Sequence, residues 1–154
     1  MVKIKKRASL NYITKEYKGP FEEIPFKEYI QDLKEWAREK KANPYGKPAA
    51  FYHHEFDKAS DKNFRVEIGI PIKNRKKGGG GYKLKFLPPV NIALEKFKGT
   101  PADYLEAYKE IYNYIEKKGY KIVGLKMEKF KKIPEKEEGV FQIKSELQVP
   151  VEKK

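Results

Sequence analysis

The chain has 154 residues and a net charge of +13, and it is 39% hydrophobic and 14% aromatic, which is enough to build the core of one domain. It has no cysteine, no apolar run near the ~18 residues of a membrane span and no apolar segment of a signal peptide behind its charged start. These absences exclude disulfide and thiolate chemistry, argue against a membrane partner and favour a cytoplasmic protein. The positive charge is mostly lysine intermixed with 22 acidic residues, a pattern typical of a solubilising surface, which disfavours nucleic acid as a partner.

The first predicted strand covers residues 2–18 and ends at a glycine, which can adopt the positive φ of a turn. Residues 91–99 repeat its pattern much later in the chain. The two segments match at a constant offset of 80 residues, which pairs Asn11, Tyr17, Lys18 and Gly19 with Asn91, Phe97, Lys98 and Gly99.

A helix is predicted after each of these glycines. The first runs from Glu22 to Lys41 and tolerates Pro25 in its first turn. Its apolar stripe, at helical spacing, consists of Phe26, Tyr29, Ile30, Leu33, Trp36 and Ala37.

The second predicted helix has a clear start and a clear end. Thr100 is its expected N-cap, Pro101 takes the first position and Asp103 completes a capping box. The helix runs to Lys118 and stops at Gly119. Its predicted apolar stripe, at an offset of 79 from the first, is Leu105, Tyr108, Tyr112 and Ile115.

Two strands are predicted after each helix, at residues 49–56 and 64–72 and at residues 121–130 and 141–151. The last strand of each half matches at an offset of 79, so that Glu67 corresponds to Glu146. We therefore predict one domain over residues 1–154, made of repeats 1–73 and 82–152 and joined by the Lys/Gly-rich linker 74–81. The linker is not a phosphate-binding loop, because no lysine and Ser/Thr follow its glycines.

The predicted fold class is α+β. Two strand–helix–strand–strand modules that join edge to edge would form a curved, mostly antiparallel sheet with two helices on one face. The seam between the modules is then the expected place for a cleft.

This order of elements resembles the GyrI-like small-molecule-binding domain, which is also the effector-binding half of MerR-type and AraC-type multidrug-responsive regulators. The resemblance covers nearly the whole chain and rests on residues 97–99, Tyr108, Gly119-Tyr120 and residues 146–151. It implies a ligand cleft between the two modules, with the late-strand carboxylate Glu146 inside it among aromatic residues. Because the sequence starts at the first predicted strand, we expect a standalone form without a helix-turn-helix.

Glu146 is thus the central candidate for ligand binding. In the strand 145–151, Ser145, Leu147 and Val149 point one way, whereas Glu146 and Gln148 point the other. A carboxylate in an aromatic groove of low dielectric attracts a cation strongly, and ring faces add ~0.5–2 kcal/mol. The alternative is a glutamate that faces solvent and pairs with a lysine. Glu67, its counterpart in the first half, is a further candidate.

Trp36, Tyr52 and Tyr108 are the predicted walls of the groove, and Tyr112 and Phe86 are further candidates for ligand contact. The alternative for each is an ordinary core position. Eleven tyrosines are a high count, and buried tyrosines need partners for their hydroxyl groups. No metal site or other cofactor is predicted, because the only histidines are adjacent and face opposite ways on a strand; we expect both near the surface.

The predicted function is binding of a small hydrophobic or cationic molecule, for sensing or sequestration. The first alternative follows from the resemblance, since a subset of the family is similar to hydrolases of cyclopropane-bearing electrophiles. In such an enzyme Glu146 would position or deprotonate water, although no nucleophile–base pair is visible in the sequence. The second alternative is a nucleic-acid- or protein-interaction module that uses the lysine-rich surface.

Overall fold

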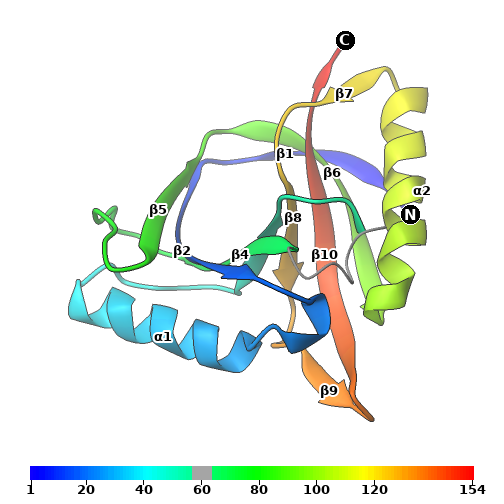
Figure 1. Ribbon diagram of the computed structural model, residues 1–154. Coiled ribbons are helices and arrows are strands. Elements are labelled where there is room, and N and C mark those ends of the chain that lie inside the picture. The colour runs from blue at the N-terminus through cyan, green and yellow to red at the C-terminus, as the bar shows by residue number, and fades with distance from the viewer. Residues whose placement is uncertain (57–63) are drawn as a thin grey trace.

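The computed structural model of the protein describes residues 1–56 and 64–154. Its two α-helices are α1 (Phe26–Glu39) and α2 (Tyr104–Lys117) (Figure 1). The strands in the described residues are β1 (Lys3–Arg7), β2 (Leu10–Lys18), β3 (Ala49–Tyr52), β4 (Arg65–Pro71), β5 (Tyr82–Leu87), β6 (Val90–Gly99), β7 (Tyr120–Ile122), β8 (Lys126–Phe130), β9 (Glu135–Glu137) and β10 (Val140–Lys153).

One antiparallel sheet organises the described residues, with the strand order β1-β6-β10-β8-β3-β4-β2-β5 and with β7 and β9 paired to β10. The first half of the chain contributes β3, and the second half contributes β8. These two strands pair directly, with Ala50 opposite Glu128, so they form the seam between the halves. The predicted α+β class with a mostly antiparallel sheet is confirmed.

The sheet must curl, because its connections are too short for a flat arrangement. Between β1 and β2 lie six strand spacings, or about 29 Å in a flat sheet. The two residues 8–9 that connect them allow three Cα steps, or about 11 Å. One hollow accordingly contains residues of β1 and β5, from the two ends of the strand order, together with residues of the central strands β3 and β8. The sheet therefore has a concave face, and α1 and α2 cover the convex one (Figure 1).

Helix α1 begins later than predicted. The residue before a proline avoids helical geometry, and Ile24, which precedes Pro25, is extended with φ −61° and ψ 120°. Residues 21–23 form a separate 3-10 turn, so the helix starts at Phe26 rather than at Glu22. The buried face of the helix is Phe26, Ile30, Leu33, Trp36 and Ala37, which confirms most of the predicted stripe.

The predicted capping box is present, and the Thr100 backbone N–H donates to the Asp103 carboxylate at 2.9 Å. It caps a 3-10 turn at Pro101–Asp103, however, so α2 begins at Tyr104 rather than at Pro101. Gly119 ends the element with φ +79°, also as predicted. The predicted stripe was wrong at Leu105, which is 42% exposed. Tyr104 is buried in its place, because its hydroxyl finds a hydrogen-bond acceptor in the core; Tyr108, Ile111 and Ile115 complete the buried face.

Three predicted strand segments differ from the structure. Residues 2–18 form two strands, since β1 pairs with β6 while β2 pairs with β4 and β5. The segment 121–130 is split into β7 and β8, which pair with different parts of β10. The strand predicted at 49–56 ends at Tyr52, and residues 57–63 lie outside the described part of the chain.

The main core fills the space between the convex face and the helices. A smaller cluster on the concave face contains Tyr12, Ala49, Phe51 and Met127. In the described ranges, no helix has both the length and the apolar character needed to cross a membrane.

Candidate functional site

The seam strand β8 places a carboxylate inside the main core. Glu128 is 0% exposed and lies on the same side of β8 as Phe130, which belongs to the helix-covered core. Burial of an ionised carboxylate is costly unless hydrogen bonds replace its water. The hydrogen-bond partners of Glu128 therefore show how far the cost of burying it is offset.

Three hydroxyl groups donate hydrogen bonds to Glu128. The Tyr104 hydroxyl lies 2.7 Å and 2.8 Å from the two carboxylate oxygens, and the hydroxyls of Tyr52 and Ser145 donate to one oxygen each. These donors come from α2, β3 and β10, so three separate elements converge on one carboxylate.

Burial raises the pKa of Glu128 to about 7, even though the hydrogen bonds from Ser145, Tyr52 and Tyr104 act to lower it. Burial and the nearby Glu128 charge raise the pKa values of Tyr52 and Tyr104 well above 10. The phenols therefore stay protonated as donors, whereas the carboxyl group changes its charge near neutral pH.

Aromatic rings surround this carboxylate. The Phe56 ring stacks on Tyr108 with a centroid distance of 5.2 Å and an interplanar angle of 7°. Its centroid is also 4.4 Å from that of Tyr104 and 4.7 Å from that of Tyr52. The electron-rich faces of such rings attract cations. The surroundings of Glu128 thus already accommodate one flat ring.

The outer edge of this cluster is polar. Glu55 accepts a hydrogen bond from Tyr112 at 3.1 Å and pairs with Lys126, also at 3.1 Å. Next to them lies a hollow of about 220 Å³ that has Tyr52 in its wall. The hollow thus borders a residue whose hydroxyl donates to the buried carboxylate.

The structure brings together only some of the predicted site residues. Tyr52, Tyr108 and Tyr112 lie in or beside the Glu128 cluster. Trp36 instead packs from α1 against Tyr82, with a centroid distance of 5.6 Å. Phe86 on β5 is 46% exposed and lines the hollow on the concave side.

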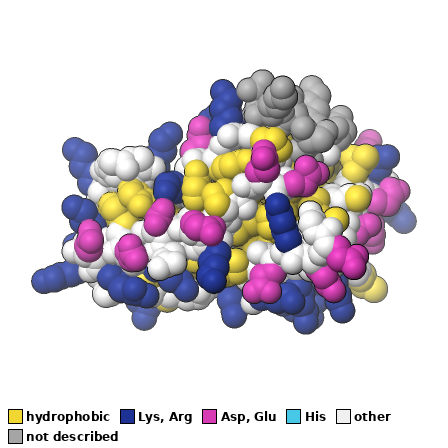
Figure 2. Space-filling view, turned by 60° about the horizontal axis from the view of Figure 1, so that its bottom comes forward, with side chains coloured by type: hydrophobic (Ala, Val, Ile, Leu, Met, Phe, Trp, Pro, Cys, Tyr) yellow, Lys and Arg dark blue, Asp and Glu magenta, His cyan; other side chains and the backbone are white. Residues whose placement is uncertain are grey.

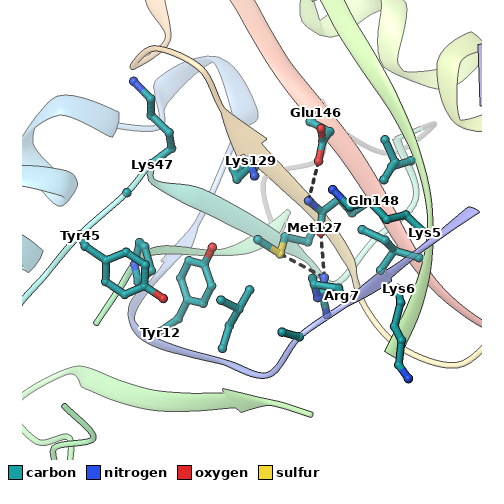
Figure 3. Close-up of a pocket in the computed structure, with 16 residues that line it drawn as sticks. Lys5, Lys6, Arg7, Tyr12, Tyr45, Lys47, Met127, Lys129, Glu146 and Gln148 are labelled. Atoms are coloured by element: carbon teal, nitrogen blue, oxygen red, sulfur yellow. Dashed lines mark hydrogen bonds between the residues drawn. The ribbon is translucent and has the colours of Figure 1, made fainter. Parts of the chain in front are cut away.

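Glu146 also lies on the concave face, so it does not share a cleft with the predicted walls Trp36, Tyr52 and Tyr108. The predicted alternation of β10 is confirmed, but it turns Ser145 rather than Glu146 towards the helices. Glu146 accepts a hydrogen bond from the Gln148 amide at 2.8 Å, in the wall of a cavity of about 400 Å³ (Figure 3). Its contact with a ligand stays a prediction.

Glu67, the counterpart of Glu146, is engaged in a polar network on the same face. It accepts from Thr14 at 3.1 Å and lies 2.7 Å from His53 Nε2 and 3.1 Å from Lys85 Nζ. Burial alone would raise the pKa of Glu67, but the His53 and Thr14 hydrogen bonds and the Lys85 charge outweigh it and lower the pKa. His53 is therefore held in this network rather than free at the surface. The described residues contain no cluster of three metal-ligating side chains.

Sequence reasoning missed Glu128 and Tyr104. Glu128 stands between Lys126 and Lys129, a pattern typical of a solvated strand, and at an offset of 79 it corresponds to Ala49 rather than to an acid. The available signal was the tyrosine count, because many buried phenols need a shared acceptor. The position of that acceptor follows only from the pairing of β8 with β3 and β10.

Comparison with known proteins gives the family. Residues 1–152 match the family described as GyrI-like small molecule binding domain, so the chain belongs to this family and the predicted resemblance is confirmed. No curated protein sequence matches the chain.

Solved structures share the fold at low sequence identity. The EcmrR C-terminal domain is 22% identical, with 100% of this chain and 98% of that chain covered and a TM-score of 0.68. In the EcmrR–DNA complex, at 21% identity and a TM-score of 0.70, 100% of this chain spans 58% of the EcmrR chain.

Two more distant structures carry names that bear on function. A hydrolase encoded by lin2189 from Listeria innocua is 12% identical, with 98% and 91% of the two chains covered and a TM-score of 0.72. SAV2435 bound to tetraphenylphosphonium is 13% identical, with 99% and 94% covered and a TM-score of 0.51. At these identities the likeness concerns the fold.

Proposed function

We propose that this domain binds a flat hydrophobic or cationic small molecule beside Glu128, at the seam between the two halves. One observation carries the proposal: a fully buried carboxylate has tyrosine hydroxyls as donors and ring faces as neighbours. Burying an ionised carboxylate at this position costs stability. A ligand-binding role accounts for that cost.

The ligand would take the place of the Phe56 ring. The adjoining hollow of about 220 Å³ is smaller than the ~300–1,000 Å³ of typical small-molecule pockets. The Phe56 ring lies between Tyr52, Tyr104 and Tyr108, so its movement would free a slot of suitable shape. A ligand ring in that slot would keep the same stacking contacts.

A positive charge on the ligand would be favoured by the Glu128 charge and by the ring faces. Tetraphenylphosphonium is a suitable first probe, because it joins a cation to flat rings and is the molecule bound to SAV2435. The role would be sensing or sequestration, in which the ligand leaves unchanged.

A hydrolase remains the second candidate, with Glu128 in the role first predicted for Glu146. A general base works best when its pKa lies near the working pH, and the pKa of Glu128 is about 7. An enzyme would convert an electrophilic substrate, and Glu128→Gln would abolish the rate while leaving some binding.

A role in nucleic-acid binding has less support. On the face in Figure 2, acidic side chains are interspersed among the lysines and arginines, so the positive charge forms no continuous stripe there. Such a stripe is the usual footprint of nucleic-acid binding.

The test is a calorimetric titration of tetraphenylphosphonium into the wild type, Glu128→Gln and Glu110→Gln. Glu110 is an exposed residue of α2, so Glu110→Gln removes the same charge outside the site. We expect Glu128→Gln to weaken binding about tenfold or more, which is about 1.4 kcal/mol, and Glu110→Gln to leave it unchanged. Equal affinities in all three proteins would refute the proposal.

A further inference from the structure

The concave face contains a half-buried positive charge, Arg7. Ile4 of β1 packs against the helix-covered core, so Arg7, three residues later, points to the concave side. The Arg7 guanidinium donates to the Gln148 side-chain oxygen at 2.8 Å and lies 3.6 Å from the Met127 sulfur (Figure 3).

This arginine lacks an anionic partner. Across residues 1–56 and 64–154, no carboxylate lies within ion-pair distance of it. Its Nε atom is buried, and in the same residues it has no hydrogen-bond acceptor. Burial lowers the pKa of Arg7, yet an arginine stays protonated in proteins. A half-buried charge without a counter-charge is costly, and an incoming anion would remove that cost.

The surrounding cavity has the size and lining for a small molecule. Its volume of about 400 Å³ falls within the ~300–1,000 Å³ range of ligand pockets. Its apolar surface comes from Leu10, Tyr12, Tyr45, Ile92, Leu94 and Met127.

The charged groups of the lining are mostly positive. Lys5 and Lys129 join Arg7, whereas the amines of Lys6 and Lys47 point away from the cavity in Figure 3. Glu146 is the one carboxylate among the lining residues, and it accepts a hydrogen bond from the Gln148 amide. Such a lining attracts anions and repels cations.

We propose that this cavity binds a small anionic amphiphile, with an acidic head on Arg7 and an apolar body over Leu94 and Met127. The head would be a carboxylate, sulfonate or phosphate monoester, which the planar guanidinium can contact with two N–H groups. A neutral ligand would leave Arg7 unpaired, and a cation would face Arg7 and the lysines. The cavity and the Glu128 cluster lie on opposite faces of the sheet, so the two proposals stand independently.

The probe is octanesulfonate, which is ionised at all working pH values, with octanol and octyltrimethylammonium as charge controls. Binding is followed by NMR of isotope-labelled methionine methyl groups. The chain has two methionines, Met127 in the cavity wall and Met1, which is 101% exposed and serves as the internal reference. Calorimetry of wild type and Arg7→Met gives the affinities. Arg38→Met, an exposed arginine of α1, is the matched control.

We expect octanesulfonate to shift the Met127 signal saturably, with no shift of Met1 and little response to either control ligand. Arg7→Met should weaken binding about tenfold or more, while Arg38→Met and Glu128→Gln bind as the wild type does. If Arg7→Met does not fold, Arg7→Lys, which keeps the charge but loses the planar fork, should weaken binding severalfold. Equal response to octanol, or a non-saturating shift of both methionines, would overturn the proposal. Loss of tetraphenylphosphonium binding alone would not affect it.

Discussion

Replacing Glu128 by glutamine should change how the stability of the protein depends on pH. The carboxyl group has an ordinary pKa of 4.5 in the unfolded chain and a pKa of about 7 in the folded protein, because burial penalises its charge. The two values differ by about 2.5, and each pKa unit corresponds to 1.36 kcal/mol. The ionised carboxylate therefore costs about 3 kcal/mol of stability at high pH.

The sign follows from proton binding in the two states. Below about pH 4 both states hold the proton, so Glu128 imposes no penalty. Between 4.5 and about 7 the unfolded chain releases the proton while the folded protein keeps it, so the free energy of unfolding falls as pH rises. Above about 7 the penalty is complete and constant.

Urea denaturation of the wild type and Glu128→Gln at about pH 4 and about pH 8 measures this difference. Glutamine cannot ionise, so the variant should gain about 3 kcal/mol relative to the wild type between the two pH values. A constant offset from altered hydrogen bonds cancels in that comparison, and Glu110→Gln should show no such gain. If the two proteins kept the same difference in stability at both pH values, Glu128 would not carry a raised pKa and the argument for a costly buried charge would fail.

Three further predictions concern the same site. Phe56→Ala should lower stability by about 3 kcal/mol or more, since it removes a buried ring, and it should tighten tetraphenylphosphonium binding in calorimetry, because the competing ring is gone. Affinity for this cation should fall about tenfold for each pH unit below 7, since the cation needs the ionised Glu128; a neutral ligand should show no such loss. Ser145→Ala removes one donor to the carboxylate and should raise the pKa of Glu128 further, which moves the pH dependence of cation binding upwards.

Local patterns predicted much of the fold. The capping box at Thr100, the stop at Gly119 and the apolar face of α1 depend on neighbours within a few residues, and all three are confirmed. The alternation around Glu146 was also correct. The error lay in the choice of face: a strand's alternation gives two faces, and only the pairing of distant strands decides which one the helices cover.

The site itself depended on those distant pairings. Glu128 looks like a solvated residue next to Lys129, and its burial arises only because β8 lies between β3 and β10. The residues predicted to form one groove lie apart for the same reason. Tyr52 is on the seam strand β3, whereas Trp36 faces Tyr82 of the edge strand β5. Sequence reasoning can thus count the tyrosines that need an acceptor, but it cannot locate the acceptor.

The two proposed sites share one strand, which makes their independence measurable. Met127 and Glu128 are consecutive residues of β8 and face opposite sides of the sheet. A cation that binds beside Glu128 and leaves β8 in place should leave the Met127 methyl signal unchanged. Movement of β8 on binding would shift that signal and couple the two sites. Each ligand would then change the affinity of the protein for the other ligand by the same factor. Titration of each ligand in the presence of the other therefore distinguishes two separate sites from two coupled ones.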